Sequence, residues 1–342
     1  MKPSSETQRR SHVCTPTTAA GSRIDNATQR RLEEEAAATG SPFESASIMT
    51  AGYDNPALPR RSNRCPRPDT SSGRHYGEAM DVLLLGTGAS DGVPNAWCTC
   101  PTCAEARASG AIRTNTSALV DDALLLDCGP DAPRQAQRAG RDLAGLRTVL
   151  LTHAHDDHLN PSFLMHRGWV SERPLQVIGP APAIGRCVDW LAPDQQVVTL
   201  TTVTAGDEFT VDGYRVLVLP ATHYALGEAV LYAIEHEGRR LLYATDTGPW
   251  KPAVLELLAG WRFDLVLLEE TFGDAVPPGE GHHDFVSFGA ALDDLRGIGA
   301  LDDASRVVAI HLGHDNPQLA ELTRRLAAFG AEAHPDLTLL TI

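Results

Sequence analysis

The sequence predicts an α/β fold in which two β-sheets form the core and helices cover their outer faces. Short aliphatic segments of strand length recur along the chain, and helical patterns lie between the later ones. Alternation of this kind over roughly 260 residues is typical of a layered α/β domain. Hydrophobic residues make up 42% of the 342 residues, which is enough to bury such a core.

The first 79 residues do not share this pattern. They are rich in Ser, Thr, Arg, Pro and Gly, and no apolar periodicity persists in them. Such a composition buries too little apolar surface to fold, so it predicts a disordered tail, with a spurious N-terminal extension as the alternative. Cys14 and Cys65 lack close metal-binding neighbours there. The folded domain is expected to span residues 80–342, and Met80 stands directly before its first strand.

The strands follow in order from Met80. The stretch MDVLLLGTGASDGVP (80–94) contains an apolar strand that runs into a glycine-rich turn. A hairpin is expected over 116–129, where Asp121 and Asp122 separate two apolar runs. Further strand segments are expected at 147–152, 174–179, 214–223, 229–248, 263–271 and 306–315. Helical patterns occupy 252–258, 285–295 and 317–329.

Composition and charge exclude several classes of protein. No run of about 18 apolar residues is present, so we expect no membrane-spanning helix and no membrane partner. The N-terminus lacks the apolar segment of a secretion signal, which predicts a cytoplasmic protein with reduced cysteines. Residues 80–342 carry 18 Lys and Arg against 35 Asp and Glu. A domain this acidic argues against an extended nucleic-acid partner, because phosphate backbones bind basic patches.

The segment HAHDDH (153–158) directly follows an aliphatic strand. It supplies four candidate ligands, which are His153, His155, Asp157 and His158. Imidazole nitrogens and carboxylate oxygens suit Zn, Mn or Fe. One metal ion cannot take four ligands from so tight a turn, whereas two ions can share them. The segment therefore predicts a dinuclear metal site rather than a polar loop in which each histidine is merely solvated.

A dinuclear site needs further ligands, and three other strand ends supply them. His223 ends the strand in LPATHY, Asp246 follows LLYAT, and His311 follows VVAI. Taken singly, His223 is typical of a partly buried histidine and Asp246 of an ordinary turn. Their shared position after aliphatic strands, downstream of HAHDDH, indicates that all three complete the metal site.

A second group of candidate ligands lies in WCTCPTC, which contains Cys98, Cys100 and Cys103. Three thiolates from one loop leave a tetrahedral zinc ion one ligand short. His314, three residues after His311, is the natural fourth ligand, so that one loop would serve both sites. The spacing predicts one structural Zn²⁺. A redox pair of Cys100 and Cys103, or a metal-free role for the thiols, is the alternative.

The order HxHxDH, His, Asp, His resembles the successive metal motifs of the metallo-β-lactamase superfamily, over about residues 80–342. The resemblance implies an αββα sandwich with two divalent ions, Zn²⁺ or Mn²⁺, at its active site. It assigns His153, His155 and His223 to one ion, Asp157, His158 and His311 to the other, and Asp246 to a bridge between them. Asp127, in LLLDCG, resembles the aspartate that supports this site from behind the ligands.

A narrower resemblance, to the PhnP-type phosphodiesterases, rests on GTG-x5-P at 86–94, the cysteine triad, HAHDDH and the late H-L-G-H. It implies hydrolysis of a small cyclic phosphodiester, such as phosphoribosyl 1,2-cyclic phosphate, by a hydroxide that bridges the two ions. The general acid would be the histidine that precedes an acidic residue. That is His282, counted back from Asp284, and the doubled histidine leaves His283 as the alternative. Asp246 would take part in catalysis as the bridging ligand.

Substrate contacts and rival functions complete the expectations. Arg113 and Asn115 in IRTNTS are candidates to bind a second phosphate group, with surface ion pairing as the more common role of a single arginine. A tRNase Z-like nuclease shares the GTG opening and the metal motifs but requires a basic arm for tRNA. PqqB-like cofactor-biosynthesis proteins share the cysteine triad, and other ester or lactone hydrolases also use dinuclear sites. A non-catalytic metal-binding regulator is the alternative from another class. The expected partner is a small phosphodiester, with a homodimer left open.

Overall fold

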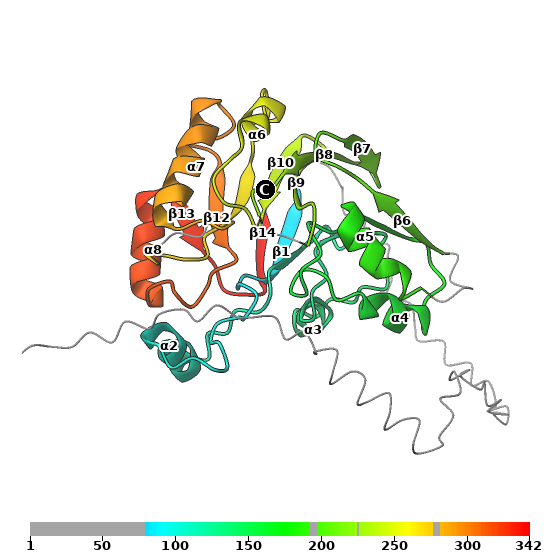
Figure 1. Ribbon diagram of the computed structural model, residues 1–342, viewed down its shortest axis with the longest axis horizontal. Coiled ribbons are helices and arrows are strands. Elements are labelled where there is room, and N and C mark those ends of the chain that lie inside the picture. The colour runs from blue at the N-terminus through cyan, green and yellow to red at the C-terminus, as the bar shows by residue number, and fades with distance from the viewer. Residues whose placement is uncertain (1–78, 192–196, 224–225, 276–280) are drawn as a thin grey trace, which may run out of the picture. The chain divides into compact units, whose positions relative to one another are not determined.

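The computed structural model describes residues 79–191, 197–223, 226–275 and 281–342. These residues form two seven-stranded β-sheets with helices packed outside them (Figure 1). The predicted N-terminal segment, residues 1–79 with Cys14 and Cys65, lies outside the described residues except for Ala79.

The first sheet has the strand order β14-β1-β2-β3-β4-β5-β6. Its strands are β1 (Asp81–Gly86), β2 (Ser117–Val120), β3 (Leu124–Leu126), β4 (Thr148–Leu150), β5 (Leu175–Gly179), β6 (Val198–Thr202) and β14 (Thr338–Thr341). Neighbours run antiparallel from β14 to β3 and parallel from β3 to β6. Asp121 and Asp122 form the predicted hairpin turn, with φ of 50° and 55°. This left-handed backbone matches the twist of the two antiparallel strands that the turn joins.

The second sheet has the strand order β13-β12-β11-β10-β9-β8-β7. Its strands are β7 (Glu208–Val211), β8 (Tyr214–Pro220), β9 (Val230–His236), β10 (Arg239–Ala244), β11 (Leu265–Glu269), β12 (Arg306–Ile310) and β13 (Ala331–Ala333). It repeats the pattern of the first sheet, antiparallel from β7 to β10 and parallel from β10 to β13. The sequence analysis missed the four outermost strands, β6, β7, β13 and β14. They are short and largely exposed, so they lack the aliphatic run that marks an inner strand.

The described helices are α2 (Pro101–Ser109), α3 (Ala132–Arg138), α4 (Ser162–Gly168), α5 (Ala181–Val188), α6 (Pro252–Leu257), α7 (Phe285–Gly297) and α8 (Leu319–Ala328). The last three correspond to the predicted helical patterns. α7 begins at a capping box, in which Asp284 accepts from the Ser287 backbone N–H at 2.7 Å and the Ser287 hydroxyl accepts from the Asp284 N–H at 3.0 Å. Among the described residues, no helix is long and apolar enough to cross a bilayer.

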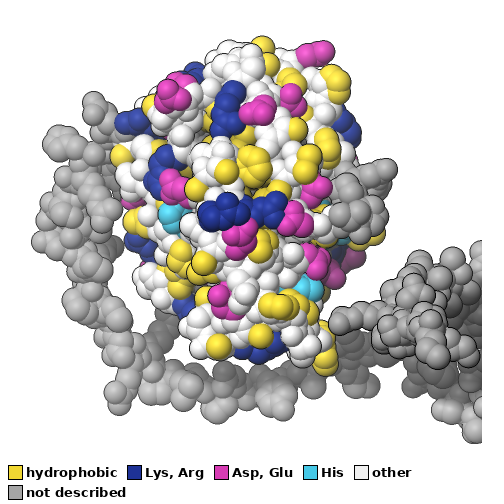
Figure 2. All heavy atoms as spheres, turned by 90° about the vertical axis from the view of Figure 1, so that its left-hand side faces the viewer, with side chains coloured by type: hydrophobic (Ala, Val, Ile, Leu, Met, Phe, Trp, Pro, Cys, Tyr) yellow, Lys and Arg dark blue, Asp and Glu magenta, His cyan; other side chains and the backbone are white. Residues whose placement is uncertain are grey.

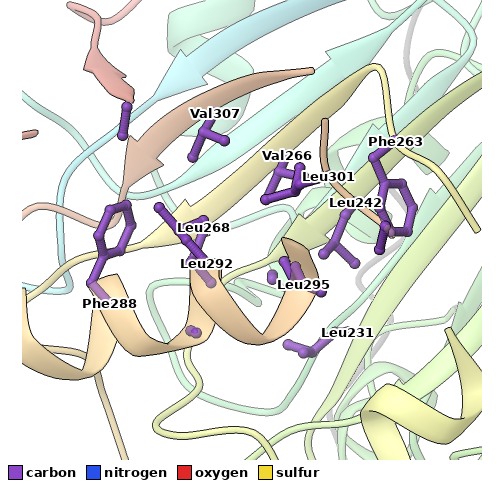
Figure 3. Packing of buried hydrophobic residues seen from close by; sticks show 14 of the residues in the cluster. Leu231, Leu242, Phe263, Val266, Leu268, Phe288, Leu292, Leu295, Leu301 and Val307 are labelled. Atoms are coloured by element: carbon purple, nitrogen blue, oxygen red, sulfur yellow. The ribbon is translucent and has the colours of Figure 1, made fainter. Parts of the chain in front are cut away.

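Three apolar layers hold the sandwich together. Val82 and Tyr243 belong to the layer between the two sheets. Leu83, which points the other way from the first sheet, packs in the layer beneath α3, α4 and α5. On the outer face of the second sheet, Leu292 of α7 faces Leu268 of β11 (Figure 3). This succession of helix, sheet, sheet and helix confirms the predicted αββα sandwich.

Candidate metal centre

Four strand ends bring the predicted ligands together at one edge of the sandwich. β4 leads into the loop that carries His155, and β8 leads to His223. β10 ends just before Asp246, and β12 ends just before His311. These four side chains line one cavity of about 510 Å³. The fold therefore collects, in one place, residues that are widely separated in the sequence.

The backbone is left-handed at two of these strand ends and at the end of β3. φ is 59° at Asp127 after β3, 50° at Asp246 and 54° at His311. This conformation costs a non-glycine residue of order 1 kcal/mol and persists where the surrounding structure imposes it. It bends the chain sharply as each strand ends, and the three side chains meet at the cluster instead of continuing the alternation of the strands.

The first group of ligand atoms comes from His153, His155, His223 and Asp246. These atoms all lie within 4.8 Å of one another. His153 Nε2 is 3.1 Å from Asp246 Oδ2, and His223 Nε2 is 3.1 Å from His155 Nδ1. Three imidazoles and one carboxylate form a set that binds zinc and similar divalent ions.

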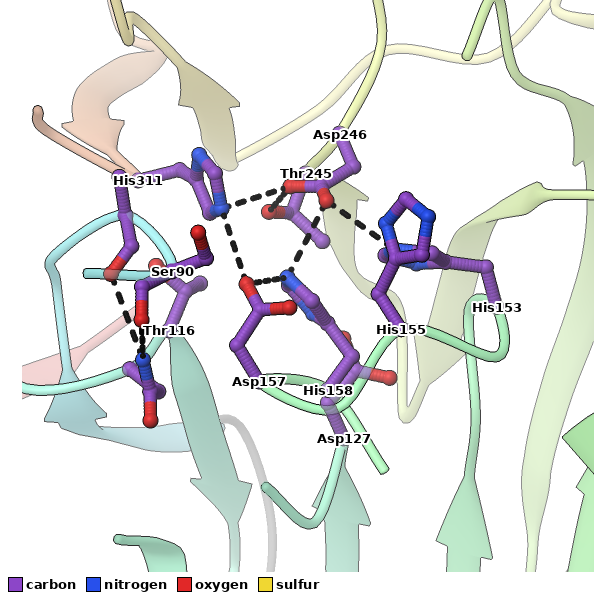
Figure 4. Close-up of polar contacts among 12 residues, drawn as sticks. Ser90, Thr116, Asp127, His153, His155, Asp157, His158, Thr245, Asp246 and His311 are labelled. Carbon is purple, nitrogen blue, oxygen red and sulfur yellow. Dashed lines mark hydrogen bonds and ion pairs between the residues drawn. The ribbon is translucent and has the colours of Figure 1, made fainter. Parts of the chain in front are cut away.

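The second group comes from Asp157, His158, His311 and again Asp246, with ligand atoms within 4.8 Å of one another. His158 Nε2 is 3.0 Å from Asp157 Oδ2, and His311 Nε2 is 2.9 Å from Asp246 Oδ1. Figure 4 shows Asp246 between the two groups, with Oδ1 toward His311 of the second group and Oδ2 toward both His153 of the first group and His158 of the second. A carboxylate shared in this way can bridge two ions. We call the residues of both groups the strand-end cluster: His153, His155, Asp157, His158, His223, Asp246 and His311.

Hydrogen bonds to Nδ1 orient the rings of four histidines in the strand-end cluster. The Nδ1 partners are Asp127 Oδ2 for His158 (2.8 Å), Thr152 Oγ1 for His153 (3.0 Å), Thr271 Oγ1 for His311 (3.0 Å) and Gly281 O for His223 (3.0 Å). Asp127 also accepts from the Thr152 backbone N–H at 2.8 Å and from the Tyr243 hydroxyl at 3.1 Å. These bonds fix each ring and leave its Nε2 for the cluster.

Several ligand atoms of the strand-end cluster lie close to other ligands but form no hydrogen bond within the described residues. Among the described residues, four of its buried atoms have no hydrogen bond: His153 Nε2, His158 Nε2, His311 Nε2 and Asp157 Oδ2. Leaving a buried polar atom unpaired costs about 1–3 kcal/mol. All four atoms belong to the two groups defined above, where metal ions would satisfy them. The donor set therefore fits two divalent ions.

Charge and burial favour the metal-binding forms of two side chains in the cluster, Asp246 and His223. Burial raises the pKa of Asp246, but the imidazoles of His158 and His311 outweigh burial and hold that pKa well below its usual range. Burial lowers the pKa of His223 to about 4, so its ring is neutral at pH 7. Metal ions bind the carboxylate and the neutral imidazole, which are the forms that Asp246 and His223 take at pH 7.

The Cys/His cluster, comprising Cys98, Cys100, Cys103 and His314, is the second predicted site. Its sulfur and ring nitrogen atoms lie within 4.8 Å of one another, and all three cysteines are free thiols. His314 Nδ1 is 3.6 Å from Cys98 Sγ and 3.8 Å from Cys100 Sγ. Burial raises the pKa of Cys100, but the Cys103 backbone N–H and the His314 ring bring it down to about 7. Three sulfurs and one imidazole fit a tetrahedral Zn²⁺.

The cavity beside the strand-end cluster contains His282 and not His283. His282 Nδ1 is 3.0 Å from Glu269 Oε1, and its ring stacks on His311 with 5.4 Å between ring centres. Burial lowers the pKa of His282, but the Glu269 carboxylate raises it above its usual value. His283 is fully buried, 5.9 Å from the ring of Trp250, and burial lowers its pKa to about 4.

Comparison with known proteins identifies the family. The sequence profile of the beta-lactamase superfamily domain matches residues 123–312, more than half of the chain. The chain belongs to this superfamily. One relative, ribonuclease Z from Mycobacterium sp. (strain KMS), is 32% identical over 213 residues, which cover 55% of this chain and 67% of the relative.

Solved structures with the superfamily fold match most of this chain. Zn²⁺-bound PqqB from Methylobacterium extorquens has a TM-score of 0.63 and 23% identity, covering 76% of this chain and 99% of PqqB. A diphosphatase from the PhnP family has a TM-score of 0.61 and 22% identity, covering 78% of this chain and 98% of the diphosphatase. At such identity these two structures show the fold alone. Ribonuclease Z is among the relatives of this chain, and the chain's own ligand sets fit divalent ions.

Within this superfamily site, the sequence analysis missed Glu269. Glu269 ends β11 and is fully buried, and both of its carboxylate oxygens lie within 3.1 Å of His282 Nδ1. The available signal was a pair of adjacent glutamates at the end of an aliphatic strand, an unusual place for buried charge. Without the structure, nothing distinguished Glu269 from Glu270.

Of the two candidates to bind a second phosphate group, Arg113 makes its hydrogen bonds away from the cavity. Its Nη1 donates to Thr87 Oγ1 and to the carbonyl of His334, both at 2.7 Å. Arg113 is not among the residues that line the cavity, whereas Asn115, the other candidate, is. The guanidinium instead ties the glycine-rich turn after β1 to the C-terminal segment before β14.

Proposed function

We propose that the protein is a metal-dependent phosphodiesterase that hydrolyses a small phosphodiester, including a cyclic one. The observation that carries this proposal is the carboxylate of Asp246, shared by two groups of ligand atoms in a cavity whose wall holds a proton donor, His282. A phosphodiester has two non-bridging oxygens and one leaving oxygen. The cavity offers a partner for each of these three atoms.

The strand-end cluster would hold two divalent ions through the residues already named. When bound, such ions neutralise the charge of a phosphodiester and lower the pKa of water, which supplies the nucleophile. Asp127 and Thr271 contribute by fixing the rings of His158 and His311, so the ligands need not rearrange during the reaction.

His282 is the general acid of the proposal. Its Nδ1 is held by Glu269, so the second ring proton of the charged imidazole resides on Nε2, at the cavity. The Glu269 carboxylate favours the protonated ring, which keeps a proton available near pH 7. As the bond to phosphorus breaks, Nε2–H donates this proton to the departing sugar or alcohol oxygen.

A nuclease is the second candidate function, because ribonuclease Z is among the relatives. The same ligands and the same general acid would cleave RNA. Surface charge favours a small substrate. On the face that carries α7 and α8, basic side chains lie beside acidic ones (Figure 2). Pairs such as Arg324 with Glu321 at 2.6 Å leave that face without a continuous basic track for a phosphate backbone.

The experiment is a comparison of four substrate classes with the purified, metal-loaded full chain. We expect hydrolysis of bis(p-nitrophenyl) phosphate and of a nucleoside 2′,3′-cyclic phosphate, with a thioester and a lactone cleaved poorly. Preferential hydrolysis of the thioester or the lactone would overturn the proposal. A precursor tRNA represents the fourth substrate class, and its specific cleavage would favour the nuclease.

A further inference from the structure

The described residues that line the cavity beside the strand-end cluster include no Lys or Arg. Its described lining is Ser90, Asn115, Pro130, His155, Asp156, Asp157, His223, Asp246, His282 and His311. The three undescribed segments within residues 79–342, which are 192–196, 224–225 and 276–280, contain no Lys or Arg in the sequence. Among the described lining residues, the charged groups are carboxylates and imidazoles.

Basic residues from neighbouring elements are engaged elsewhere. Arg113 donates to Thr87 and His334, Arg186 to Ala154 O and Asp156 (2.5 Å), and Lys251 to Ala221 O (3.0 Å). Arg186 is the one that reaches the cavity edge, and its charge is already paired with Asp156, whose side chain is 90% exposed. An additional phosphate of the substrate would compete with this carboxylate and be repelled by it.

Two uncharged polar side chains, Ser90 and Asn115, also line the cavity. Ser90 is exposed and points toward His311 and Asp157 in Figure 4. Its hydroxyl forms no hydrogen bond within the described part of the chain. Asn115 Nδ2 donates to the carbonyls of Ala89 at 3.3 Å and Ser90 at 2.9 Å, which leaves Oδ1 without a donor among the described residues. One hydroxyl and one amide oxygen form a pair that suits the hydroxyls of a sugar.

We propose that the natural substrate carries its only negative charge on the diester itself, and that its flanking group is an uncharged, hydroxyl-bearing moiety such as a nucleoside. Ser90 and Asn115 bind that moiety, while Asp156 disfavours a second anionic group. This inference rests on the proposed phosphodiesterase activity. It separates this protein from enzymes that act on phosphoribosyl 1,2-cyclic phosphate, whose terminal phosphate requires a basic partner.

The test uses a matched pair of substrates with the metal-loaded full chain. Adenosine 2′,3′-cyclic phosphate should have a kcat/KM at least about tenfold higher than the same compound bearing a 5′-phosphate, because like charges in close contact are strongly disfavoured. The ratio should shrink as ionic strength rises. Equal or reversed values, with bis(p-nitrophenyl) phosphate still hydrolysed, would overturn this inference and leave the proposed function standing. No hydrolysis of any diester would overturn both.

Variants test which residues cause the preference for the substrate that lacks the 5′-phosphate. Asp156→Asn should lower the ratio of the two kcat/KM values by roughly two- to fivefold, the range expected for one exposed charge. Asp302→Asn is the control, since it removes an exposed carboxylate that pairs with Arg262, outside the cavity lining. Ser90→Ala should raise KM more for adenosine 2′,3′-cyclic phosphate than for bis(p-nitrophenyl) phosphate, which carries no hydroxyl group. If Asp302→Asn narrows the ratio as much as Asp156→Asn, net charge and not the cavity sets the preference, and the inference fails.

Discussion

The strand-end cluster and the Cys/His cluster differ in how the chain assembles them. Ligands of the first come from residues 153–311 and stand at the ends of strands from both sheets. Three ligands of the second lie within residues 98–103, in the turn that begins α2, and only His314 is distant. Most of the first cluster is buried, whereas Cys98, Cys100 and His314 are half-buried.

This difference indicates what each metal site contributes to the structure. The sheets hold the strand-end ligands by backbone hydrogen bonds that involve no ion. The turn of the Cys/His cluster has weaker support, since the backbone N–H groups of Cys100 and Cys103 donate to thiol sulfurs at 3.4 Å. We therefore expect the strand-end cluster to be preorganised without metal, and the Cys/His cluster to depend on its ion for its shape.

The two clusters are also connected. His311 and His314 belong to one loop after β12, so a shift of that loop displaces a ligand of each cluster. In addition, His314 Nε2 is 3.2 Å from Asp91 Oδ2, and Asp91 is the neighbour of Ser90 in the cavity. Support from the Cys/His cluster thus extends to the loop that meets the substrate.

The largest effect is expected from Asp246→Ala, which removes the carboxylate shared by both halves of the strand-end cluster. Activity should be lost, and bound metal should fall from about three ions per chain to about one, the ion of the Cys/His cluster. The domain should stay folded, because the sheets hold the remaining ligands in place. Metal analysis and circular dichroism of the purified variant measure both results.

The control for Asp246→Ala is Asp156→Asn in the HAHDDH loop. Asp156 belongs to neither group of ligand atoms, so this variant should keep all of its metal. Loss of the Cys/His ion in Asp246→Ala would contradict the prediction that the two clusters bind metal independently. So would a total of only about one ion in the wild-type chain.

The next effect in size concerns His282. His282→Ala should keep its metal but lower the rate by about 10²–10⁴-fold, the usual contribution of a general acid. Glu269→Gln should lower the rate less, because the amide oxygen still accepts from Nδ1 while the charge that raises the pKa of His282 is gone. A leaving group of low pKa, such as p-nitrophenol, should restore much of the rate in both variants, as measured by steady-state kinetics.

The control for this pair is His283→Gln. His283 is buried against Trp250 and away from the cavity, so the change should lower the melting temperature without altering how the rate depends on the leaving group. Rescue by p-nitrophenol in His283→Gln alone would move the general acid to the alternative histidine. Unimpaired rates in both His282→Ala and Glu269→Gln would place it outside this segment.

The sequence predicts the strand-end cluster well for a physical reason. Buried strands are recognisable as aliphatic runs, and His153, Asp246 and His311 stand directly after such runs. Parallel neighbours end at the same edge of a sheet, so strand ends far apart in the chain meet there. The Cys/His cluster is predictable by a different route, because three of its ligands lie within one short motif.

Other features escape the sequence because they depend on packing. Glu269 becomes a partner of His282 only once β11 and the segment before α7 lie side by side. Arg113 stands next to a cavity residue in sequence, yet its side chain reaches Thr87 and the C-terminal segment instead. Rotamer choice and contacts of this kind carry no periodic signal. Helices α2 to α5, each of at most nine residues, were not predicted from the sequence either.

A smaller effect, on stability and not on chemistry, is expected from Cys100→Ser. Losing one zinc ligand should release one ion and lower the free energy of unfolding by about 3 kcal/mol, or roughly 6–12 °C in melting temperature. KM should rise as well, because His314 and Asp91 no longer hold the loop of Ser90. Cys187→Ala is the control, a buried cysteine outside the cluster that should leave metal content unchanged.

Mild chelation also tests the difference between the two clusters. The ion of the Cys/His cluster should resist a chelator that strips the strand-end cluster, because three thiolates hold zinc more tightly than imidazoles and carboxylates shared between two ions. Chelated protein should then be inactive but as stable to heat as before. A large fall in melting temperature on losing only the strand-end ions would mean that this cluster, too, depends on metal for its shape.

The smallest effect is expected at the N-terminus. A chain that starts at Met80 should keep its activity, metal content and melting temperature, since the sequence predicts no strand or ligand before that residue. Met80 itself must remain. It is fully buried, and it exchanges two backbone hydrogen bonds with Ile342, at 2.8 and 3.0 Å, which join β1 to β14. A chain that starts at Leu83 is therefore the matched control, and it should melt several degrees lower because it loses this pairing. If the chain from Met80 melts as low as the one from Leu83, residues before Met80 stabilise the sheet on which the strand-end cluster is built.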